Sequence, residues 1–196
     1  MRQDIEEWLR EKTLEAYGAA RERLGDRASL KPLIAALFII GAIMYLTDLA
    51  VFTLLVAASA VTAYLVALVD FNWSGIELTT FTVVMAGMVF GPVQGAIAGI
   101  VLVLLQFAVG QQMGIYVLWV VPSYGIAGAV AGIAGASTPV TTGIGITVGL
   151  HLAFTMFTSI FTPGALSRYL PYAVGNTLVN IFLFQAAAGP VLALLM

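Results

Sequence analysis

The chain has 196 residues, of which 61% are hydrophobic and only 9% are charged, with a mean hydropathy of +1.02 and a net charge of −2. A soluble domain of this size needs far more polar surface, so the composition excludes an ordinary soluble protein. The near-neutral charge argues neither for nucleic acid nor for anionic lipid as a partner, and we expect no nucleic-acid partner. The absence of cysteine excludes disulfides, thiolate metal sites and cysteine catalysis.

The first 31 residues form a charged leader, which is the first predicted domain (1–31). They hold fourteen of the 18 charged side chains. Within them, apolar residues recur at helical spacing over 3–24, which predicts an amphipathic helix at the membrane interface or a helix that docks a cytoplasmic partner. Arginines and a lysine gather directly before the first apolar segment, so we expect a cytoplasmic N-terminus. The leader lacks the apolar core of a cleavable signal peptide.

The second predicted domain, 32–196, is an all-α bundle of six or seven helices that crosses the cell membrane and contacts the lipid bilayer. Its apolar runs are continuous, whereas a membrane β-barrel would alternate polar and apolar residues. The predicted spans are 32–47, 50–69, 77–90, 92–110, 115–135, 139–162 and 169–195.

Two of these spans leave the topology open. The first two spans form one apolar run that is interrupted only by Thr47-Asp48, so the pair is either a tight hairpin or a single broken, tilted helix. This choice decides on which side the C-terminus lies. The segment 77–90 is short for a span, and it therefore extends past Pro92, tilts, or enters the membrane only part of the way.

Small residues four positions apart recur on several spans. This spacing leaves a flat face on which another helix can approach closely. We expect packing within one compact bundle, the alternative being a docking face for a partner membrane protein. The residues are Ala63 and Ala67, then Gly91, Gly95 and Gly99, then Gly128 and Gly132, and finally Gly145 and Gly149.

Polar side chains within the spans mark candidate sites, because each is costly in hydrocarbon. His151, the only histidine, either bonds a neighbouring helix or contacts a ligand or proton. Asn176 and Asn180 lie one helical turn apart and can bond a polar ligand or another helix. Glu77, at the end of a span, could pair with Arg168 if both lie on the same side of the membrane.

Aromatic residues fall mostly near the ends of spans, as in an interfacial belt. Trp119 and Tyr124 are the exceptions, because Pro122 between them can open the helix beside a cavity. We expect no enzymatic activity, no cofactor and no metal site. One histidine cannot make a multi-histidine metal site, and the chain lacks the motifs of zinc proteases, serine hydrolases and phosphate-binding loops.

The glycine-rich stretch from Leu78 to Gly99 resembles the second and third spans of S components, the substrate-binding subunits of energy-coupling factor (ECF) vitamin transporters. In both, a span that ends in Phe90-Gly91-Pro92 or its equivalent is followed at once by a Gly-Ala-x-x-Gly helix, here Gly95 to Gly99. The last span, with Gly175-Asn176, Asn180 and Pro190, is similar to the closing helix of that family. The resemblance covers about residues 76–195.

The resemblance implies a six-helix core that binds a vitamin-like small molecule near its outer face. It also implies a membrane T subunit and two cytoplasmic ATPases as partners, while this chain hydrolyses nothing. The charged leader and the extra apolar segment depart from the family pattern, as does the Ala63–Ala67 pair, which lies on the second span rather than the first. The expected ligand contacts are Glu77, Trp119, His151, Asn176 and Asn180.

Scaffold proteins of the MreD type have a similar pattern of spans, so the alternative function is a membrane scaffold without transport activity. A ligand-binding subunit should gather Glu77, Trp119, His151 and Asn176 around one cavity, whereas a scaffold should bury them singly in helix contacts. A third class, a small channel or proton-coupled carrier, would need Asp48, His151 and the amides along one path.

Overall fold

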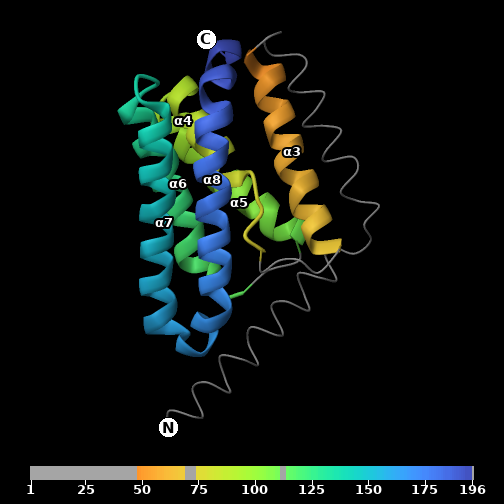
Figure 1. Cartoon of the computed structure of the whole chain (residues 1–196), viewed down its shortest axis with the longest axis vertical. Coiled ribbons are helices and arrows are strands. Elements are labelled where there is room, and N and C mark those ends of the chain that lie inside the picture. Colours follow the sequence, from red (N-terminus) through yellow and green to blue (C-terminus); the bar gives the residue numbers. More distant parts are fainter. Residues whose placement is uncertain (1–47, 69–73, 111–113, 196) are drawn as a thin grey trace.

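A computed structural model describes residues 48–68, 74–110 and 114–195. These residues form α-helices and one short 3₁₀ helix, with no strand among them, and the helices lie side by side in a bundle (Figure 1). The prediction of an all-α bundle is thereby confirmed. The elements are α3 (Asp48–Leu68), α4 (Thr79–Phe90), α5 (Pro92–Gly110), α6 (Val117–Ala134), α7 (Pro139–Phe161), η2 (Pro163–Ala165) and α8 (Leu166–Leu195).

Five stretches of the described chain are long and apolar enough to cross a membrane: α3, α5, α6, α7, and α8 together with η2. Large apolar side chains cover their outer faces; Leu118 is 75% exposed and Ile133 is 78% exposed. Such a surface suits lipid rather than water, and the fold is that of a multi-pass membrane protein. The predicted helix over 3–24 and the span 32–47 lie outside the described residues, so the choice between six and seven spans stays a prediction.

Helix α4 is the short central element of the bundle. Its 12 residues extend about 18 Å at a rise of about 1.5 Å per residue, well below the roughly 30 Å of a bilayer core. Its side chains from Thr79 to Met88 are all buried, so α4 is surrounded by protein rather than lipid. The helix does not extend past Pro92, because Gly91 has a φ of 93° and separates α4 from α5.

Glycine allows α4, α5 and α6 to touch through their backbones. A Cβ atom added to Gly87 or to Gly95 would collide with the carbonyl oxygen of Gly128, and one added to Gly128 would collide with the carbonyl of Gly95. One turn away on α5, Gly99 lies against the carbonyl of Tyr124, and Gly132 lies against Pro92. Close backbone approach of this kind favours tight helix association in lipid.

The other predicted small-residue positions have different surroundings. Gly91 makes the turn between two helices, as described above. On α3, Ala63 is buried and Ala67 is half-buried. On α7, Gly145 and Gly149 face open space, because no atom lies within 4 Å of a Cβ added at either position.

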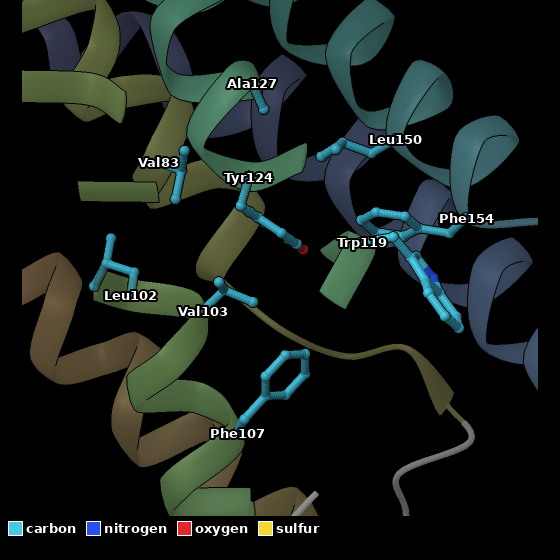
Figure 2. Packing of buried hydrophobic residues seen from close by; sticks show 9 residues of the cluster. All are labelled: Val83, Leu102, Val103, Phe107, Trp119, Tyr124, Ala127, Leu150 and Phe154. Atoms are coloured by element: carbon cyan, nitrogen blue, oxygen red, sulfur yellow. The ribbon is translucent and has the colours of Figure 1, made fainter. Parts of the chain in front are cut away.

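Two apolar clusters fill the bundle. The first gathers side chains from α4, α5, α6 and α7, which converge around Tyr124 (Figure 2). The second joins α4 to α6 and α8, and in it the rings of Phe81 and Phe184 lie 5.1 Å apart. Because α4 contributes to both clusters, it ties together the halves of the bundle. The first cluster also forms one side of the cavity described next.

Candidate functional site

A half-enclosed cavity of about 550 Å³ lies at the end of the bundle where α5 and α7 end and α6 and α8 begin. Its wall mixes aromatic rings with polar groups, and each of the four helices contributes. Its side chains capable of hydrogen bonding are Gln106, Tyr116, Trp119, Tyr124, Thr158, Thr162, Arg168, Tyr169 and Tyr172. A wall of this composition can stack on a flat ligand and also bond its polar atoms.

Beneath the cavity lies the carboxylate of Glu77, only 3% exposed. Its Oε1 accepts hydrogen bonds from the Thr80 hydroxyl at 2.7 Å, the Asn176 amide at 2.9 Å and the Tyr124 hydroxyl at 3.3 Å. Its two oxygens also accept from the backbone N–H groups of Thr79 (3.2 Å) and Thr80 (3.4 Å). Glu77 thus satisfies free N–H groups at the start of α4 and ties α4 to α6 and α8.

Glu77 and Arg168 do not form the pair that the sequence suggested. The carboxylate is buried among neutral donors, whereas Arg168 is exposed at the cavity wall, and no ion pair joins the two. Five donors surround Glu77, so the side chain is satisfied by hydrogen bonds rather than by a countercharge.

Asn176 is the centre of a buried hydrogen-bond network and is itself fully buried. Its Nδ2 donates to the carbonyl oxygen of Gly75 at 3.0 Å and to Glu77 at 2.9 Å. Its Oδ1 accepts from the Nδ2 of Asn180 at 3.0 Å and lies 2.6 Å from Nε2 of His151. Both N–H bonds and both lone pairs of the Asn176 amide are therefore used.

These contacts determine which nitrogen of His151 carries hydrogen. Because the Nδ2 of Asn176 donates to two oxygens, its Oδ1 must face His151, and Nε2 of the histidine must donate. In a neutral imidazole, Nδ1 then accepts from the Tyr169 hydroxyl, 2.8 Å away. Tyr169 lines the cavity, so the chain Asn176–His151–Tyr169 connects the buried network with the cavity wall.

The structure brings four of the predicted ligand contacts, Glu77, His151, Asn176 and Asn180, into this one network below the cavity. The fifth, Trp119, lies on the cavity wall, where its ring stacks on Phe161 at 5.7 Å and on Phe157 at 6.3 Å. The Oδ1 of Asn180 is the one buried side-chain oxygen in the described part of the chain that lacks a hydrogen-bond partner.

Sequence reasoning assigned the tyrosines of α8 to an interfacial belt and missed their place at the cavity. Tyr169, Tyr172 and Asn176 are three and four residues apart, which puts them on one face of a helix. The rings of Tyr169 and Tyr172 lie 5.9 Å apart, and that of Tyr172 is 6.0 Å from His151. This shared spacing with Asn176 was the signal that could have found them.

Tyr116 lies in the turn before α6, outside the membrane-spanning helices, and its ring packs edge-on against Phe107 at 5.4 Å. Burial raises the pKa of its hydroxyl to about 12. The hydroxyl therefore keeps its proton at neutral pH, and Tyr116 adds no charge to the cavity wall.

A second hollow is a larger, mostly apolar groove of about 1020 Å³ between α6 and α7. Pro122 lies along its α6 side, and Gly145, Gly149 and Ala153 lie at successive turns along its α7 side. The groove is therefore bordered by small residues on one helix and by a proline on the other.

No family model matches the chain, and no curated protein or solved structure matches it. The interpretation of the site thus rests on its geometry and chemistry. The described residues contain no group of three or more side chains that could hold a metal ion. Their arrangement at the cavity suits binding of a small molecule by stacking and hydrogen bonds.

Replacing Glu77 tests whether the carboxylate holds the network together. In Glu77→Gln, the amide NH₂ must face one of the groups that now donate to the carboxylate. We therefore expect the free energy of unfolding to fall by about 1–3 kcal/mol, and by more in Glu77→Leu. Thermal unfolding in detergent measures both variants against Gln94→Leu, a control at an exposed polar position on α5. Equal melting temperatures for Glu77→Leu and the control would contradict this role.

Proposed function

We propose that this chain is the small-molecule-binding membrane subunit of a transporter of the ECF type, and that the cavity between α5, α6, α7 and α8 is its binding site. The observation that carries the proposal is this cavity of about 550 Å³, bordered by polar side chains from four helices. Small-molecule sites typically measure about 300–1,000 Å³ and combine apolar walls with a few placed polar groups.

The buried network supports binding by fixing the cavity wall in advance. Tyr124 is held by Glu77 and by the Thr80 hydroxyl, 2.9 Å from its own. Tyr169 is held by His151. A ligand then meets hydroxyl groups that are already oriented, which lowers the entropy that binding must lose.

On this proposal, a T-type membrane subunit and cytoplasmic ATPases drive transport, and they dock on apolar faces of this chain. Helix α3 offers one such face, because Leu54, Val61, Leu65 and Leu68 are each more than half exposed. Of the small-residue pair on this helix, Ala67 is half-buried, whereas Ala63 packs inside the bundle. Small and apolar residues of this kind suit contact with another membrane helix.

A membrane scaffold of the MreD type is the second candidate. The α6–α7 groove favours it, because Gly145 and Gly149 leave room for a helix from another protein. A scaffold needs no ligand, so the two candidates differ in whether the purified protein retains a small molecule. Adjacent genes for ATPases and a T subunit would also favour transport, whereas cell-wall genes would favour the scaffold.

Blocking the cavity mouth tests the proposed function. We expect the detergent-purified chain to retain a small molecule by native mass spectrometry and to gain thermal stability from a member of a vitamin panel. Ala165 is exposed and lines the cavity, so Ala165→Trp should abolish both effects, whereas Ser167→Trp, at an exposed residue outside the lining, should leave them intact. A wild-type chain that retains nothing and responds to no vitamin would refute the proposal.

A further inference from the structure

Arg168 is the only lysine or arginine between positions 32 and 196. It lies in the first turn of α8, on the wall of the cavity, and its side chain is exposed. No ion pair joins it to any residue within the described ranges; Glu77, their only acidic residue besides Asp48 at the start of α3, is buried with its own donors. Arg168 thus lines the proposed binding site, and no described residue of that site supplies a countercharge.

The surroundings of Arg168 make the local electrostatic potential more positive. None of the described residues that line the cavity is acidic. Helix α8 begins at Leu166, so the positive end of its dipole lies at the same place. The carboxylate of Glu77 is not part of the lining; it is buried and accepts a hydrogen bond from Tyr124, which does line the cavity. The mouth of the cavity is therefore favourable to negative charge.

Deeper in the cavity, the wall is aromatic. Tyr169, Tyr172, Trp119, Phe107 and Phe154 all line the cavity, and all are less exposed than Arg168. Rings of this kind favour a flat partner, by offset stacking or edge contacts. The cavity thus has two chemically distinct parts, a cationic mouth and an aromatic interior.

We propose that the ligand of this cavity is a planar ring compound that bears an anionic group, carboxylate or phosphate, and that Arg168 pairs with this group. The inference rests on the proposed function and names the class of molecule that the site binds. A guanidinium group bonds carboxylate and phosphate through two parallel N–H groups, so it can fix the position of the anion as well as neutralise it.

The experiment compares the small molecules extracted from four purified proteins: wild type, Arg168→Gln, Arg168→Lys and Ser167→Gln. Liquid chromatography with mass spectrometry in both polarities identifies what each protein retains. We expect wild type and Ser167→Gln to retain an aromatic acid or phosphate. Arg168→Gln should retain on the order of tenfold to a hundredfold less, the size of a lost charge-assisted bond, and Arg168→Lys should retain part of it.

The other possible results distinguish a failure of this inference from a failure of the proposed function. A retained neutral or cationic molecule, or an anion whose amount is unchanged in Arg168→Gln, refutes the inference and leaves the proposed function in place. If the other three proteins retain a phospholipid that Arg168→Gln has lost, Arg168 binds a lipid headgroup. This result refutes the proposal that the anion belongs to a small-molecule ligand. A wild-type protein that retains nothing refutes the proposed function itself. Since Arg168 is exposed, size-exclusion profiles of all four proteins should coincide.

Discussion

The Gly128→Val variant is expected to lose about 3 kcal/mol or more of stability and to yield little folded protein. A Cβ atom at this position collides with the carbonyl of Gly95, and a retreat of α5 would also break the close contact of Gly99 with the backbone of Tyr124. The branched side chain would therefore have to push α5 away from both α4 and α6. The measurement is the fraction of monodisperse protein on size exclusion after detergent extraction, together with its melting temperature.

Gly145→Val provides the matched control, because it makes the same substitution within a membrane helix. A Cβ atom at position 145 meets nothing within 4 Å, and the residue is exposed on α7. The control should stay within about 1 kcal/mol of the wild type, the usual range of helix-propensity differences. If the two variants behave alike, the three-helix contact at Gly128 does not govern assembly.

Asn176→Leu is expected to destabilise the bundle by about 3 kcal/mol or more, since it keeps the size of the side chain and removes four hydrogen bonds. The carbonyl of Gly75 and Nε2 of His151 would each lose a buried partner, and each unsatisfied group costs about 1–3 kcal/mol. Glu77 and Asn180 would each lose one bond and keep others. Thermal or denaturant unfolding in detergent measures the loss.

Gln185→Leu controls for removing an amide from the same helix, because Gln185 is exposed on α8. Its expected effect is small. Asn180→Leu should fall between the two, because Asn180 only donates to Asn176 and its own oxygen has no partner. An Asn176→Leu protein as stable as the Gln185→Leu protein would show that the network contributes little to the fold.

The order and bounds of the helices could be predicted from the sequence. Each predicted span from 50–69 onward matches a helix to within three residues at either end, and 92–110 coincides with α5. Continuous apolar runs define helices in a membrane, and Gly91-Pro92 marks the junction of α4 with α5 sharply. The predicted span 169–195 begins after the charged Arg168, whereas α8 begins at Leu166 and holds Arg168 in its first turn.

The arrangement of these helices was less predictable. In a soluble protein, apolar residues point inward, but here lipid-facing and buried surfaces are both apolar, so periodicity does not say which faces meet. The polar residues within the spans were informative, because Glu77, His151, Asn176 and Asn180 are all buried inside the bundle. Their partners could not be named, because Glu77 and Asn176 are separated by 99 residues and nothing local relates them.

The cavity itself could not be predicted from the sequence, for a related reason. Its wall forms where four helices begin or end. The amino-acid sequence at a helix end is similar whether that end faces water, lipid headgroups or an enclosed space. Tyr169 and Tyr172 fit an interfacial belt by composition alone. Only their register with Asn176 on α8 distinguishes them, and that register becomes meaningful once the amide is known to point inward.

The short helix α4 also bears on how the chain assembles during synthesis. Non-helical backbone before α4 is tolerated because α8 covers it: a Cβ atom at Gly75 would collide with the backbone of Tyr172 and Asn176, and Asn176 binds the Gly75 carbonyl. The ribosome makes α8 about a hundred residues after this segment. Until α8 arrives, the Gly75 carbonyl lacks the Asn176 amide and Glu77 lacks one of its five donors, so the start of α4 is among the last parts of the protein to reach its final place.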